Sequence, residues 1–202
     1  MSVDFLYDRR MTGHNPKREE AWAILQDHVK NPSLICHAVA VEAVMRYIAR
    51  KKGADEEVWG IIGLIHDLDY EEHPDEHLRH APEILRSRGW PEDHIRAVLA
   101  HGWGLCTDVE PVTDLEKTLF AIDELTGLVA AAALVRPSRS ILDLPVKSVR
   151  KKWKDKAFAA GVNREVIEKG ASMLGVSLDD LIADTIEGMR PVAEQIGLKG
   201  TL

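Results

Sequence analysis

The sequence predicts an all-α fold, a helical bundle with a C-terminal helical extension. Apolar residues recur every three to four positions along almost the whole chain, which is the period of a helix that buries one face. No stretch alternates apolar and polar residues as a half-buried strand does, and no Asn-Gly or Asp-Gly pair marks a hairpin turn. With 202 residues, 45% of them hydrophobic, the chain is long enough to form a core without disulfides.

Start and stop signals for helices recur along the first two thirds of the chain. Ser33 is the expected N-cap of the second predicted helix, and Gly53 ends that helix in the usual C-terminal glycine position. Asp55 is the expected N-cap of the third helix, and the spacing of Thr113 and Glu116 fits a capping box. The predicted helices cover about residues 17–29, 33–52, 56–66, 76–88, 91–100 and 114–135.

The last third of the chain differs in character. Residues 139–145 look irregular, residues 147–156 are rich in Lys and Arg, and two more helices are expected over 164–174 and 178–196. We find no internal repeat and no low-complexity linker. We therefore predict one domain over residues 1–202, with a core of about 33–135 and an extension of about 139–202 packed against it.

Composition and charge argue against some classes of binding partner and indicate the cellular compartment. The formal net charge of -7 argues against a binder of nucleic acid duplexes, because no excess of Lys and Arg is present to displace counterions from phosphates. A small phosphorylated substrate needs only a local positive cluster. Cys36 and Cys106 are too few for a disulfide scaffold. Residues 1–10 do not resemble a signal peptide, and the longest apolar stretch, 128–135, is far shorter than a membrane span. We expect a cytoplasmic protein without a membrane partner.

Polar residues interrupt apolar helix faces at three places. His37 shares its face with apolar residues, His66 and Asp67 follow an apolar run, and Asp123 lies inside a largely apolar helix. Each has a structural interpretation alone: a core histidine, a helix-end carboxylate, an Asp bonded to nearby backbone. Taken together, two imidazoles and two carboxylates on packed helices can hold a divalent ion, and the ion offsets the cost of burying both acids. Positions for water and substrate then remain open.

The ordered set His37, His66-Asp67 and Asp123 resembles the HD superfamily of metal-dependent phosphohydrolases. The segments His-Asp-Leu-Asp-Tyr-Glu at 66–71 and Asp-Glu-Leu-Thr-Gly-Leu at 123–128 resemble a bacterial subgroup of these hydrolases more closely. This resemblance implies an HD-domain helical bundle, a divalent metal at the four motif positions, and hydrolysis of a phosphate ester or phosphoanhydride of a small substrate such as a nucleotide. The ion implied is Mn, Fe, Zn, Co, Ni or Mg, with one or two bound.

Some HD families hold a second metal with two extra histidines, and His77 and His101 resemble those ligands. Asp67 would then bridge the two ions. A solvated loop histidine and a helix-end histidine are the other interpretation of His77 and His101. The sequence departs from two known variants: Leu-Asp follows the His-Asp doublet in place of Ile-Gly, and no Gly-Tyr-Pro signature follows His101. The second departure argues against cyclic-dinucleotide cleavage. The five remaining histidines are expected on the surface, two of them, His73 and His80, as outer-shell candidates; the other three are His14, His28 and His94.

The same resemblance suggests roles in catalysis. Asp67 would orient the attacking water or accept its proton, and Glu71 or Glu124 would serve as general base or as a partner of a ligand. The expected phosphate contacts are Arg136, Lys147, Arg150 and Lys151, with a solvated helix face as the alternative. Three other functions stay open: a regulatory module that binds a nucleotide without turnover, a metal-free buried polar cluster, and a di-iron oxygenase or lyase that uses both extra histidines. The oligomeric state is not predicted.

Overall fold

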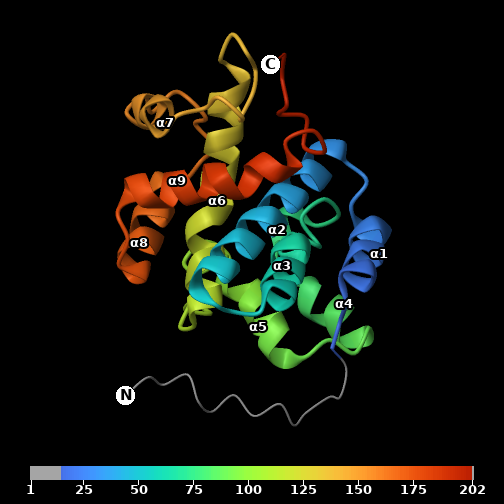
Figure 1. Ribbon diagram of the computed structural model, residues 1–202. Coiled ribbons are helices and arrows are strands. Elements are labelled where there is room, and N and C mark those ends of the chain that lie inside the picture. The colour runs from blue at the N-terminus through green and yellow to red at the C-terminus, as the bar shows by residue number, and fades with distance from the viewer. Residues whose placement is uncertain (1–14, 202) are drawn as a thin grey trace.

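The computed structural model describes residues 15–201, and Figure 1 shows them as a bundle of helices. Within this range the chain forms nine α-helices, two short 3₁₀ helices and no β pairing beyond an isolated bridge between Trp103 and Thr107. The all-α prediction is confirmed. The elements are α1 (Arg18–His28), α2 (Pro32–Lys52), α3 (Glu56–Ile65), η1 (Pro74–Glu76), α4 (Ala81–Ser87), α5 (Glu92–Ala100), α6 (Asp114–Leu134), α7 (Val146–Trp153), α8 (Arg164–Leu174), α9 (Leu178–Met189) and η2 (Arg190–Val192).

Helix α2 lies at the centre of the bundle and packs against α3, α6 and α9. Several of its side chains are fully excluded from solvent, including Val41, Val44 and Met45. Glycines of the neighbouring helices permit close approach. A Cβ on Gly188 of α9 would lie 2.7 Å from the Cα of Val44, and one on Gly63 of α3 would lie 3.2 Å from the carbonyl oxygen of Val41. At 2.7 Å a side chain does not fit without a shift of the backbone, and at 3.2 Å a Cβ would be tightly packed.

By length and composition alone, α2 is apolar enough to cross a membrane. An 18-residue window of this 21-residue helix has a mean hydropathy of 1.2, whereas the sequence analysis considered only the shorter stretch 128–135. Half of that window (50%) is buried inside the protein. The helix also carries Glu42, which pairs with Arg18 and Arg46 at 2.7 and 2.9 Å. In this fold α2 is a core helix.

The segment after α3 differs from the prediction. We expected a helix over 76–88, but only α4 is α-helical there, and residues 77–80 are irregular. The reason is Asp69, whose carboxylate accepts the backbone N–H groups of Leu78, His80 and Ala81 at 2.9–3.0 Å. These donors are therefore not available to a continuous helix. Leu78 also adopts a left-handed conformation with φ 67°, which a helix excludes.

Two helix ends differ for local reasons. Asn31, not Ser33, is the N-cap of α2, because its side-chain oxygen accepts the N–H of Ser33 at 2.9 Å. The helix expected over 178–196 ends at Met189 and continues as η2, because Pro191 has no N–H for the helical ladder. The Gly53 end, the Asp55 cap and the Thr113 capping box are as predicted.

The C-terminal third packs on the two long helices. Helix α8 lies against α6 and α9 lies against α2. The closest contact is at Gly170 of α8, where a Cβ would lie 2.5 Å from the Cβ of Ala121 in α6. Residue 198 returns to the segment after α6, where its carbonyl accepts the N–H of Ile141 at 2.9 Å. The extension therefore covers the same helices, α2 and α6, that carry His37 and Asp123.

Candidate metal centre

Three helices bring the four motif side chains to one point. His37 lies in the second turn of α2, His66 and Asp67 follow the last residue of α3, and Asp123 lies in the middle of α6. The Nε2 atom of His37 is 3.2 Å from Nε2 of His66 and 2.9 Å from Oδ1 of Asp123. Asp67 Oδ2 lies 3.7 and 3.4 Å from the same two nitrogens. Four donor atoms from distant parts of the sequence thus face a common centre.

Neighbouring groups hold both rings in the orientation that a metal requires. Nδ1 of the fully buried His66 donates to the carbonyl of Gly63 at 2.8 Å. Thr126 donates its hydroxyl proton to the carbonyl of Asp123 at 2.6 Å, so its oxygen is free to accept Nδ1–H of His37 at 3.4 Å. A carbonyl can only accept, so Nδ1 of His66 carries a proton and Nε2 is the ring atom that faces the centre.

A second group of donors adjoins the first through Asp67. The other carboxylate oxygen of Asp67, Oδ1, lies 3.2 Å from Nε2 of His77 and 3.3 Å from Nε2 of His101. These two nitrogens are 3.3 Å apart. Nδ1 of His101 donates to the carbonyl of Val98 at 2.6 Å, so this ring is oriented as His66 is. Asp67 therefore presents one carboxylate oxygen to each donor group.

The charges in the centre fit a cation. Burial alone would lower the pKa of His66, but the charges of Asp67 and Asp123 outweigh it and raise that pKa well above its usual value. Burial alone would raise the pKa of Asp67 and of Asp123, but His66 holds both well below the usual range. The two buried carboxyl groups thus stay ionised because positive charge lies beside them. Imidazole nitrogens and carboxylate oxygens are the donors that Zn, Mn, Fe, Co and Ni share.

Comparison with known families agrees with this geometry. A family model described as the HD domain matches residues 34–128. Residues 34–128 therefore form an HD domain. Searches of curated proteins and of solved structures found no match. Members of the superfamily are mostly metal-dependent hydrolases, and the matched region of this HD domain contains all six donors of the two groups. The closer resemblance to a bacterial subgroup stays a prediction.

Asp69, which supports the second donor group of the HD domain, was not among the residues predicted from the sequence. Asp69 is fully buried, and its Oδ1 accepts Nδ1–H of His77 at 2.9 Å. Burial alone would raise its pKa, but His77 and the backbone donors lower that pKa to about 2. The signal in the sequence is an acid directly after the buried Leu68, which we noted only as a departure from the Ile-Gly variant.

The two candidate bases have different surroundings. Glu124 follows Asp123 in α6 and is half-buried; burial and the charge of Asp123 raise its pKa, and it accepts the N–H of Asn163 at 3.2 Å. Glu71 is exposed, and one of its oxygens accepts the N–H groups of Lys30 and Asn31 at 2.8 and 2.9 Å. Glu71 therefore holds the turn between α1 and α2, while Glu124 lies beside the centre.

The four cations expected to contact phosphate lie after α6 and on α7, outside the two donor groups. Arg136 pairs with Asp143 at 2.7 Å, and Arg150 pairs with Asp179 at 2.9 Å. Arg136 lies beyond the last residue of α6, and the helix rises about 16 Å from Asp123 to its end. Lys147 and Lys151 are exposed on α7, which lies at the end of the bundle away from α4 and α5. Within residues 15–201 these four cations thus have other surroundings.

The other histidines fall into three cases. The placement of His94 on the surface is wrong: it is buried in α5 and packs edge-on against Trp90, with ring centres 6.0 Å apart. His73 and His80 stack at 3.8 Å and form a separate donor group with the exposed Glu76 instead of joining the centre. His28 is half-buried and contacts an exposed glutamate, and His14 lies outside the described residues.

Proposed function

We propose that this HD-domain protein is a hydrolase that cleaves a phosphate ester or phosphoanhydride of a small substrate at two divalent metal ions. The observation that carries the proposal is the position of Asp67 between two complete donor groups. His37, His66, Asp123 and Oδ2 of Asp67 would hold one ion. His77, His101 and Oδ1 of Asp67 would hold the other. Mn, Fe, Zn, Co and Ni suit these donors best, and Mg suits them less because it prefers oxygen.

The chain's own residues have distinct tasks in this proposal. The bound ions would neutralise phosphoryl charge and acidify water. Asp67 aligns the two groups, Thr126 orients His37, and Asp69 orients His77. Glu124, whose pKa is raised by burial and by the charge of Asp123, would exchange a proton with water or with the leaving oxygen. We assign no task in the reaction to Glu71, because the α1–α2 turn occupies its carboxylate.

The remaining expectations belong to the same proposal. The partner is a small phosphorylated molecule and not a nucleic acid duplex or a membrane, and the protein works in the cytoplasm. Arg136 and Arg150 pair with acids, so they are weaker candidates for phosphate binding than the sequence suggested. The ions themselves would then supply most of the positive charge that the phosphoryl group meets.

A second function has one observation in its favour. A di-iron oxygenase or lyase of the HD type needs both extra histidines, and the structure places His77 and His101 together beside Asp67. Iron content and a requirement for dioxygen separate this function from hydrolysis.

The test is metal analysis combined with phosphate release. Untagged wild-type protein, reconstituted with Mn or Fe, should bind about two ions per chain and release phosphate from members of a panel of phosphate esters. His77→Ala should keep about one ion, and Asp67→Ala should bind neither tightly, because only Asp67 contributes to both groups. His28→Ala, a histidine outside both groups, is the control. A wild-type protein that binds no metal after reconstitution would leave the six residues as a structural polar cluster.

A further inference from the structure

An apolar cavity of about 380 Å³ is lined by residues of α2, α6 and the C-terminal segment, and it shares His37 with the metal centre. His37 lines its near end, together with Thr126. Ala130 and Leu134 line it along the next turns of α6, and Ile196 of the C-terminal segment lines it as well. From Thr126 to Leu134 the helix rises about 12 Å. A ligand held at the centre therefore has an elongated space in which to place its other end.

The cavity shares residues with the centre itself. His37 contributes Nε2 to the first donor group and also lines the cavity. Thr126 lines the cavity while its hydroxyl is engaged with the carbonyl of Asp123 and with His37. A phosphate at the ions would thus have the cavity directly beside it. A ligand bound at the ions therefore has an apolar space near it in which its other end can lie.

The walls of the cavity are suited to hydrocarbon. Pro, Ala, Leu, Met and Ile provide most of the lining, and no Lys or Arg lines it within the described residues. The polar groups that line it are few, and the hydroxyl of Thr126 is already engaged. A nucleoside placed here would lose hydrogen bonds to water from its hydroxyls and ring nitrogens and regain few of them. A hydrocarbon chain makes no hydrogen bonds to water that it could lose, and the removal of its surface from water would favour binding.

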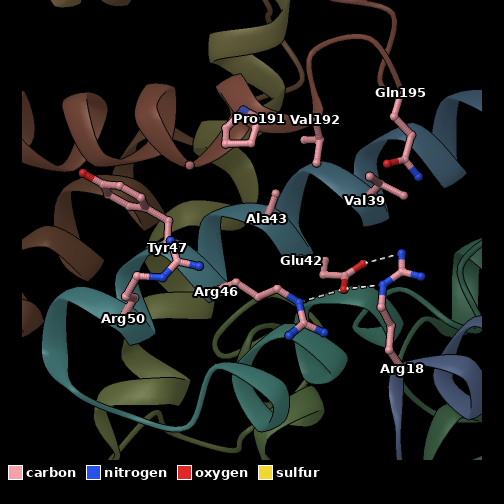
Figure 2. A pocket seen from close by; sticks show the side chains of 11 residues that line it. Arg18, Val39, Glu42, Ala43, Arg46, Tyr47, Arg50, Pro191, Val192 and Gln195 are labelled. Carbon is pink, nitrogen blue, oxygen red and sulfur yellow. Dashed lines mark hydrogen bonds and ion pairs between the residues drawn. The ribbon is translucent and has the colours of Figure 1, made fainter.

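A second cavity, of about 450 Å³, lies on another face of α2, but it does not change this conclusion. Figure 2 shows Glu42 between Arg18 and Arg46 at its edge, joined to both by short contacts. Arg50, which also lines this cavity, pairs with Glu56 at 2.6 Å. The arginines there are already neutralised by acids. None of the six donors of the metal centre lines this cavity.

We infer that the substrate of the metal centre is a phosphate ester of an apolar alcohol, whose hydrocarbon chain lies in the cavity between α2 and α6. This inference rests on the proposed function, because it takes the phosphate to be the reacting end. It replaces the expectation of a nucleotide with a substrate whose specificity comes from chain length. Each methylene added to the chain is expected to raise kcat/KM about fourfold until the cavity is filled.

The test compares butyl, hexyl and octyl phosphate with AMP on the metal-loaded protein. We expect kcat/KM to rise with chain length and to exceed the value for AMP. Ala130→Phe, which fills the cavity, and Leu134→Asp, which places a charge at its far and exposed end, should both flatten this dependence. Ala23→Phe is the matched control, because Ala23 is exposed on α1, away from the cavity.

Binding of butyl- and octylphosphonate, measured by calorimetry, gives a readout that does not require turnover. Equal affinity for the two phosphonates, or AMP turned over best with no effect of Ala130→Phe, would overturn the inference and leave the hydrolase proposal standing. Absence of phosphate release from every ester, with octylphosphonate still bound much more tightly than butylphosphonate, would support the cavity's role and reject hydrolysis. The two proposals can therefore fail separately.

Discussion

Oδ1 of Asp69 lies 2.9 Å from Nδ1 of His77, and the same carboxylate accepts three backbone N–H groups from the segment that carries this histidine. The carboxylate thus both shapes the segment and aims the ring. Because His77 belongs to the second donor group, Asp69 is a positioning residue for that group alone. His37 and His66 of the first group have other partners, Thr126 and Gly63.

Replacement of Asp69 by Ala should therefore have two effects. We expect the free energy of unfolding to fall by about 2–5 kcal/mol, because buried backbone donors lose their acceptor. We also expect the second ion to bind about 10–100 times more weakly while the first is retained. Urea unfolding in the presence of a chelator and metal titration measure the two effects. Asp75→Ala, an exposed acid in the same segment, is the control. An equal loss of affinity for both ions would contradict the role of Asp69 as a positioning residue for the second group alone.

Glu124 and Glu71 should respond differently to the same change. Glu124→Gln should lower kcat by about 10²–10⁴-fold with metal content unchanged, because an amide cannot exchange the proton. Glu71→Gln should leave kcat close to wild type and cost about 1 kcal/mol of stability, because its carboxylate holds the backbone at Lys30 and Asn31. Steady-state measurement of kcat, on samples whose metal content has been determined, shows which of the two glutamates takes part in the reaction. A large loss of kcat in Glu71→Gln alone would reverse the assignment.

Metal uptake by the metal-free protein should depend on pH. Burial lowers the pKa of His77, but Asp67 and Asp69 outweigh it and raise that pKa to about 9. The ring therefore holds a proton at neutral pH, and a metal must displace it. Affinity for the second ion should fall as pH falls below about 9, about tenfold per pH unit for each proton displaced. Chelator competition at several pH values measures this, with proton release followed in parallel. An affinity that stays constant between pH 7 and 9 would contradict it.

The C-terminal extension should unfold together with the core. At Gly170 of α8 a Cβ would lie 2.5 Å from the Cβ of Ala121, so Gly170→Ala should destabilise the protein by about 1–3 kcal/mol. At the exposed Gly161 no atom lies within 4 Å of such a Cβ, so Gly161→Ala should have little effect. A single thermal transition that shifts as a whole in Gly170→Ala supports one domain. Two separate transitions, with only one of them shifted, would show that the extension folds on its own.

The fold class and the first donor group could be predicted from the sequence because both depend on helical periodicity. His37, His66-Asp67 and Asp123 interrupt apolar faces, and apolar faces must pack together. The same reasoning failed for the helix expected over 76–88. There the Asp69 carboxylate accepts backbone N–H groups from 9 to 12 residues away, and no local pattern reveals such a partner.

The sequence by itself determined most of the helices, their order and the types of the metal-binding side chains, because period, caps and residue chemistry are local properties. Only the tertiary structure decided that Asp67 faces two donor groups, that Glu71 and Arg136 are engaged elsewhere, and that an apolar cavity adjoins His37. These properties depend on contacts between segments that are distant in the chain. The packing of α2, α6 and the C-terminal segment sets the space between them, and no single segment carries that information.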